Sequence, residues 1–203
     1  GVSAVQARDR GQLVFLEGLK ECLSVLVPED NGTGDGPLDF LRDSAVGLRS
    51  LYQFVQSSVS VPDGGRGQWG PPVLLVDDLS VLLSLGVDVN NLLDFSHYCR
   101  ATVCSQRQGN VVMLVRCDEE EEEEDAADEG SERLLTGLTH QSSLMLHVQG
   151  LPTGYCRDIH GQVEVSWRRR RADGQQPQKK LFQYKVHDKG ASFFAPGTSS
   201  AVL

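Results

Sequence analysis

Two neighbouring aspartates, Asp77 and Asp78, follow a short apolar run at Val73–Val76. In P-loop NTPases, carboxylates at the carboxyl end of a buried strand hold the magnesium ion of the bound nucleotide. The phosphate-binding half of such a site is a glycine-rich loop that ends in Gly-Lys-Ser or Gly-Lys-Thr. This chain has five lysines, and none of them follows a glycine. The sequence therefore predicts degenerate Walker motifs: a Walker-B-like strand without a phosphate loop.

The two aspartates also have a structural interpretation. Asp78 directly precedes an apolar run at helical spacing that begins at Leu79, and a carboxylate there accepts hydrogen bonds from the free amides of a helix. Asp77 would then end a strand in solvent. We favour this interpretation over metal binding, because carboxylates hold Mg²⁺ together with substrate phosphates rather than alone. No metal and no cofactor are therefore expected.

A cluster of basic residues near the C-terminus forms the second candidate site. Its members are Arg168, Arg169, Arg170, Arg171, Lys179 and Lys180. Basic side chains at a hairpin tip can bind a nucleic-acid backbone, and Trp167 beside them could stack on a base. The alternative is a solvated basic loop over residues 168–180, with Trp167 inward like Val163 and Val165. Both interpretations stay open, and in either of them we expect Trp167 in the core.

The histidines and cysteines add no catalytic or metal site. The five cysteines are widely spaced and contain no Cys-x-x-Cys pair. His97 and Cys99 lie two residues apart on an expected helix, so their side chains point in different directions. No Gly-x-Ser-x-Gly elbow or other nucleophile motif is present. The sequence therefore predicts a protein that is not an enzyme.

The acidity of the chain is concentrated in one segment. Residues 118–129 contain ten acidic residues and no basic one, within a chain of net charge −9. Without those ten charges the rest of the chain is nearly neutral, so we expect residues 118–130 to be a disordered acidic loop. No signal peptide and no apolar run of membrane-spanning length is found. Together with the cysteine pattern, this favours the cytosol or the nucleus.

Strands and helices alternate along the part of the chain that holds the aspartates. Strands are expected at Gln12–Leu16, Val73–Val76, Val111–Val115 and Ser143–Val148. Helices are expected from Pro37 to before Pro62, over Leu79–Leu85, from a cap at Asn90 or Asn91 to before Gly109, and over Ser131–His140. The core-facing residues of the first and third helices are predicted to be Leu41, Leu48, Leu51, Tyr52, Val55, Val59, Leu92, Phe95, Cys99 and Val103.

The C-terminal part of the chain changes to alternating apolar residues. Two strands are expected there, one with Val163, Val165 and Trp167 on one face and one with Phe182, Tyr184 and Val186. A turn at Asp188–Gly190 leads to a further strand over Ala191–Phe194. The predicted fold class is α/β: a RecA-like (P-loop NTPase-like), mainly parallel sheet with helices on both faces and a C-terminal antiparallel meander.

Six stretches of sequence together resemble the family of sixth subunits of the Elongator complex. They are GQLVFLEG at 11–18, PVLLVDDLSVLLSLG at 72–86, LDFSHYCRATV at 93–103, GLTHQS at 137–142, GYCRDIHG at 154–161 and YKVHDKGASFFA at 184–195. They span nearly the whole chain and are specific in combination, although none is a catalytic signature. The resemblance implies a RecA-like fold that lacks functional Walker motifs.

The resemblance also implies a role. It implies assembly with the fourth and fifth Elongator subunits into a hetero-hexameric ring that binds tRNA and supports modification of its wobble uridines, in the cytoplasm and the nucleus. Members of this family carry an additional N-terminal portion that includes the position of a phosphate loop. We therefore expect residues 1–203 to form a single RecA-like domain that lacks its N-terminal portion.

Three functions follow as hypotheses. The leading one is a non-catalytic ring subunit. The alternative is an active RecA-type ATPase whose phosphate loop lies in the N-terminal portion, with Asp77 or Asp78 as the magnesium ligand. The third is a regulatory binder whose acidic segment mimics a nucleic acid. A Gly-Lys-Ser or Gly-Lys-Thr sequence upstream would favour the enzyme.

Overall fold

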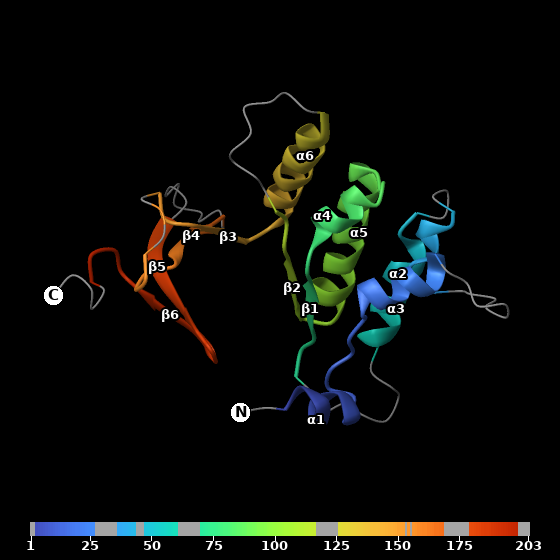
Figure 1. Cartoon of the computed structure of the whole chain (residues 1–203). Helices are drawn as coiled ribbons and strands as arrows, with labels where there is room; N and C mark the ends of the chain where they lie inside the picture. The colour runs from blue at the N-terminus through green and yellow to red at the C-terminus, as the bar shows by residue number, and fades with distance from the viewer. Residues whose placement is uncertain are drawn as a thin grey trace. The chain divides into compact units, whose positions relative to one another are not determined.

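The computed structural model describes residues 3–26, 36–43, 47–60, 70–116, 126–152, 154, 156–168 and 179–198. The chain divides into two compact units, residues 1–138 and residues 139–203 (Figure 1). The first unit holds a two-stranded parallel sheet with helices, and the second holds a four-stranded antiparallel sheet. The predicted mixed α/β class is thus confirmed. The single RecA-like domain over residues 1–203 stays a prediction.

The first unit contains the helices. They are α1 (Ala4–Asp9), α2 (Gly18–Leu26), α3 (Arg49–Ser58), α4 (Leu79–Ser84), α5 (Val89–Arg100) and α6 (Ala126–Gln141), whose last turn belongs to the second unit. A short 3-10 helix, η1 (Asp39–Leu41), precedes α3, and a π-helical segment, η3 (Ala101–Gln106), continues α5. In the described part of the chain, no helix is long and apolar enough to cross a membrane.

The parallel sheet consists of β1 (Val73–Val76) and β2 (Asn110–Met113). Gly109 sets the start of β2, because a Cβ atom at this position would lie 2.2 Å from the carbonyl oxygen of Pro72. That carbonyl oxygen accepts a hydrogen bond from the Asn110 N–H at 3.0 Å. The close approach therefore requires glycine and fixes the register in which Val73 lies opposite Asn110.

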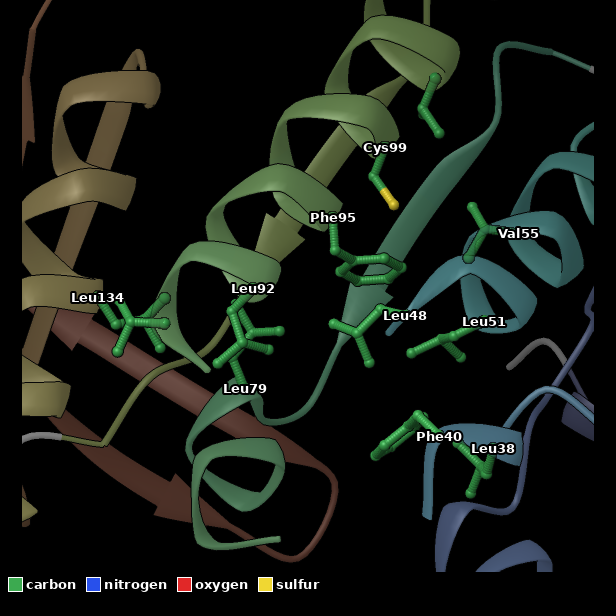
Figure 2. Packing of buried hydrophobic residues seen from close by; sticks show 12 residues of the cluster. Leu38, Phe40, Leu48, Leu51, Val55, Leu79, Leu92, Phe95, Cys99 and Leu134 are labelled. Atoms are coloured by element: carbon green, nitrogen blue, oxygen red, sulfur yellow. The ribbon is translucent and has the colours of Figure 1, made fainter. Parts of the chain in front are cut away.

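A single cluster of buried side chains forms the core of the first unit (Figure 2). Its members are Leu38, Phe40, Leu48, Leu51, Val55, Leu79, Val89, Leu92, Phe95, Cys99, Val103 and Leu134. Five of them recur at steps of three or four along α5 and η3, so this long helix turns one face to the core. All of these except Val89 were predicted to be core residues. Burial raises the pKa of the Cys99 thiol to about 12, because the thiolate would lose its hydration.

Two helix predictions are corrected in detail. The helix expected from Pro37 onward is interrupted: η1 ends at Leu41, and α3 begins at Arg49 after Gly47, which has a left-handed φ of 58°. The predicted cap at Asn90 or Asn91 is wrong, because the N-cap of α5 is Asp88, whose Oδ1 accepts from the Asn90 N–H at 2.8 Å. The predicted apolar face of α3 is confirmed.

Only one face of the parallel sheet packs on the core. Leu74, Val76, Val111 and Met113 contact the buried cluster. Their neighbours on the opposite face, Val73, Leu75 and Val112, are 60%, 70% and 53% exposed. Among the described residues, one face of the parallel sheet is therefore open and is not covered by helices as predicted. The strand expected at Ser143–Val148 pairs antiparallel with β4 and does not join the parallel sheet.

The strand expected at Gln12–Leu16 does not form. This segment has no assigned secondary structure, and its residues Leu13, Val14 and Phe15 are exposed, although Leu16 packs against the core. A strand is stable only when its backbone groups pair with a neighbour, and in the described part of the chain β1 and β2 pair only with each other.

The second unit is the predicted antiparallel meander. Its strands, β3 (Leu144–Gln149), β4 (Gly161–Trp167), β5 (Lys179–His187) and β6 (Gly190–Phe194), pair in chain order. Apolar residues gather on one face because the side chains alternate: Val163 lies opposite Val148 on β3 and Phe182 on β5. On the same face the rings of Tyr184 and Phe193 lie 6.4 Å apart.

Two segments differ from their predicted bounds. Helix α6 begins at Ala126, so the last five residues of the acidic loop expected over 118–130 are helical. Lys179 and Lys180 begin strand β5 and do not belong to the basic loop expected over 168–180. The remainder of these two predicted loops, residues 118–125 and 169–178, lies outside the described residues.

Leu92 and Leu75 allow a matched test of the packing in the first unit. Leu92 is fully buried, so Leu92→Ala should lower the free energy of unfolding by about 2–5 kcal/mol through lost burial and a cavity. Leu75 is 70% exposed, so Leu75→Ala should change it by less than about 0.5 kcal/mol. Urea denaturation measures both. A similar cost at the two positions would contradict the open face of β1–β2.

Candidate functional site

Asp78 lies two residues after β1 and is buried. Its side chain is 1% exposed, and its Oδ1 accepts a hydrogen bond from the Val81 N–H at 3.0 Å, which caps α4. Its Oδ2 lies 2.8 Å from Nε of Arg116, the third residue after β2. Oδ2 therefore has an ion pair but no hydrogen bond within the described residues. The predicted capping role of Asp78 is confirmed.

Backbone contacts hold Arg116 beside this carboxylate. The Leu114 N–H donates to the Val76 carbonyl at 3.0 Å, and the Leu79 N–H donates to the Leu114 carbonyl at 2.9 Å. The Arg116 N–H then donates to Oγ of Ser80 at 2.9 Å. These bonds extend the pairing of β1 with β2 past the ends of both strands. The Arg116 guanidinium is thereby held at the carboxyl edge of the parallel sheet.

The Arg116 guanidinium lies beside Oδ2, the Asp78 oxygen that does not cap α4. It carries a permanent positive charge and neutralises the buried carboxylate. A Mg²⁺ ion at the same oxygen would be repelled by that charge and would need further oxygen ligands. Asp77 is exposed and is joined to Asp78 by a cis peptide bond. No group of three or more His, Cys, Asp or Glu side chains within the described ranges could hold a metal ion.

Sequence reasoning missed Arg116 and Ser80. Arg116 lies close to Asp78 because β1 and β2 are adjacent and parallel, which brings their carboxyl ends to the same edge, whereas Ser80 is only two residues from Asp78 in sequence. The available signal was a basic residue directly after the predicted strand at Val111–Val115. A buried aspartate at the end of the neighbouring strand needs such a counterion.

The structure describes half of the predicted basic site. Arg168 is exposed, and its N–H donates to the Ser143 carbonyl at 3.0 Å. Lys179 places its Nζ 2.8 Å from Oε1 of Glu164, and this hydrogen bond lowers the pKa of the Glu164 carboxyl. Lys180 places its Nζ 5.7 Å from the ring centroid of Trp167. The other predicted members, Arg169, Arg170 and Arg171, lie outside the described residues.

The prediction that Trp167 belongs to the core is wrong. Trp167 shares a face with Val163 and Val165, as expected, but its side chain is 37% exposed. The reason lies in the strand pairing: β4 and β5 are paired only as far as Ser166 opposite Lys179. Trp167 is one residue beyond this pair, so no residue of β5 lies directly opposite its ring.

The two units carry opposite net charges. Residues 139–203 contain nine lysines and arginines and four acidic residues, whereas residues 1–138 contain ten basic and twenty-four acidic residues. The basic excess of the second unit includes all six predicted nucleic-acid contacts. A positive net charge on one unit of an acidic chain is typical of a surface that meets a polyanion.

The contact between Asp78 and Arg116 can be tested with a double-mutant cycle. Arg116→Gln should lower the free energy of unfolding by about 1–3 kcal/mol, because it leaves a buried carboxylate without its counterion. In an Asp78→Asn background the same change should cost less than about 0.5 kcal/mol. Arg107→Gln, at an exposed position of the same unit, is the control. Urea denaturation gives the free energies of unfolding of the parent, the two single variants and the double variant. An equal loss for Arg116→Gln in both backgrounds would contradict the pairing.

Comparison with known proteins agrees with the resemblance seen in the sequence. The family model of Elongation complex protein 6 matches residues 1–188. The chain is 58% identical to Elongator complex protein 6 of Danio rerio over 203 residues, which are all of this chain and 74% of that relative. The identity is 52% to the Mus musculus protein and 50% to the Homo sapiens protein, each over 205 residues that cover all of this chain and 74% of the relative. The chain therefore belongs to the Elongation complex protein 6 family.

Proposed function

We propose that this chain is a non-catalytic, RecA-like subunit of the Elongator complex. The observation that carries the proposal is the ion pair of Asp78 with Arg116, 2.8 Å apart, at the edge where a nucleotide-bound metal would lie. Family membership supplies the complex. A carboxylate that caps a helix and is neutralised within its own chain supports the fold and does not hold a metal ion.

Several features support the RecA-like fold within this proposal. The order of β1, α4, α5 and β2, followed by α6 and a meander, places parallel strands before antiparallel ones. Asp77 and Asp78 follow β1 at the carboxyl edge of the parallel strands, as the carboxylates of nucleotide-binding sheets do. The degenerate Walker-B motif is then this strand with a basic residue in place of the metal.

In this proposal the chain assembles with the fourth and fifth Elongator subunits in a hetero-hexameric ring, in the cytoplasm and the nucleus. The open face of β1–β2 supports an assembly, because parallel sheets are normally covered on both faces. Val73, Leu75 and Val112 form an exposed apolar strip on this face. Such strips mark protein–protein contacts.

The ring binds tRNA and supports modification of its wobble uridines. The basic excess of the second unit supports this part of the proposal. Arg168 and Lys180 are exposed, and Lys180 makes no ion pair within the described residues. Exposed cations of this kind bind RNA phosphates by releasing counterions.

The alternative is an ATPase that uses Asp77 or Asp78 as its magnesium ligand. At Asp78 this function requires the Arg116 guanidinium to leave Oδ2 and the carboxylate to leave the N-terminus of α4. Both changes cost stability. No observation on this chain favours the ATPase over the non-catalytic subunit.

The assembly is tested by co-expression with the fourth and fifth Elongator subunits. A stable complex is expected, and light scattering measures its mass. Leu75→Asp should weaken the assembly at least tenfold, because it buries a charge in the proposed apolar contact. Gln53→Asp, at an exposed polar position on α3, should have no effect. A chain that stays monomeric with both partners, or ATP hydrolysis lost in Asp78→Asn, would contradict the proposal.

The RNA contact is tested on the same complex with a labelled tRNA. Arg168→Glu and Lys180→Glu should each weaken binding several-fold and lower the slope of log affinity against log salt by roughly 0.7–0.9 per lost phosphate contact. Arg107→Glu in the first unit is the charge-matched control and should leave both values unchanged. Fluorescence anisotropy at several salt concentrations measures them. Unchanged affinity and slope in both variants would exclude these residues as phosphate contacts.

A further inference from the structure

Trp167 is an exposed aromatic side chain among the basic positions of the second unit. It is the last residue of β4 and is 37% exposed. On one side it faces Leu144 of strand β3. On the other side, the described part of β5 begins at Lys179, which lies opposite Ser166, so no described residue lies directly opposite the ring there.

Strand alternation places Trp167 and Lys180 on one face and Lys179 on the other. Lys180 lies opposite Val165, whose side chain shares the face of Trp167, and its Nζ lies 5.7 Å from the ring centroid. Lys179 lies opposite Ser166 on the other face, where its Nζ is held by Glu164 at 2.8 Å. The cation that accompanies the ring is thus Lys180.

A nucleobase can replace the Lys180 ammonium over the ring of Trp167. A cation–π contact at an exposed site is weak, and both side chains here are exposed. A nucleobase stacks on an indole over a larger area and contributes more to binding than the exposed ammonium does. The displaced ammonium then lies within a lysine side chain's reach of the phosphate of the stacked nucleotide.

We infer that Trp167 stacks on an unpaired nucleobase of the bound RNA, with Lys180 and Arg168 on neighbouring phosphates. This inference rests on the proposed RNA binding of the complex and names the part of the RNA that is bound. The bases of an RNA duplex are stacked on each other, so a side-chain ring reaches only bases in single-stranded loops, bulges or ends. The ligand class is therefore single-stranded RNA.

The first experiment uses the fluorescence of Trp167. The chain has two tryptophans, Trp69 and Trp167, so Trp69→Phe leaves Trp167 as the single indole. Titration of this variant with a single-stranded oligouridine should quench its emission, because a stacked base contacts the excited ring. An RNA duplex of the same length should leave the emission within a tenth of its starting value.

The second experiment measures affinity in the assembled complex. Trp167→Ala should weaken binding of the single strand about tenfold, Trp167→Phe should stay within about threefold, and neither should change duplex binding. Phe193→Ala is the matched control, because Phe193 is an exposed aromatic residue of β6 on the same face of the sheet as Trp167. If Trp167→Ala loses its folded circular-dichroism spectrum, the fluorescence titration decides, because it leaves Trp167 unchanged.

The outcomes separate this inference from the function it rests on. Absence of quenching, with equal binding by the parent and Trp167→Ala, overturns the stacking while RNA binding by the complex stands. Quenching by an acidic peptide but not by RNA assigns the ring to a protein partner and also overturns it. If the complex binds neither RNA, the proposed function itself fails.

Discussion

A buried carboxylate must lie next to a compensating charge, and much of the first unit is arranged around this requirement at Asp78. One oxygen caps α4 through the Val81 N–H, and the other is paired with Arg116 from the neighbouring strand. The same contact region contains the hydrogen bond from the Arg116 N–H to Ser80. Strand β1, helix α4 and the end of β2 are thus joined at a single point, where a buried carboxylate meets a cation.

Features that depend on residues close together in sequence could be predicted, whereas features that depend on which strands lie side by side could not. The strand at Val73–Val76, the cap at Asp78 and the inward face of α5 follow from residues within two helical turns, and the structure confirms them. The segment at Gln12–Leu16 and the ring of Trp167 depend on which strand lies alongside, and both predictions were wrong. Arg116 was missed because it lies far from Asp78 in sequence and reaches it only through the pairing of β1 with β2.

The chain therefore combines a buried carboxylate that is neutralised by an arginine with exposed apolar and basic surfaces. The parallel sheet has an apolar face that no described residue covers, and the antiparallel sheet ends in a tryptophan with a lysine over its ring. Membership of the Elongation complex protein 6 family agrees with a role as a subunit of the Elongator complex. The opposite charges of the two units favour binding of a polyanion to the second.

The buried thiol of Cys99 has a consequence for this chain under alkaline and oxidising conditions. Its pKa rises from the ordinary 9.0 to about 12, so at neutral pH almost no thiolate exists for peroxide or alkylating reagents to attack. Below pH 9 the folded and unfolded chains hold this proton equally. Between pH 9 and about 12 only the unfolded chain releases it, and each unit of pH then favours unfolding by roughly 1.4 kcal/mol. The residue that resists oxidation in the core thereby lowers the stability of the fold at alkaline pH.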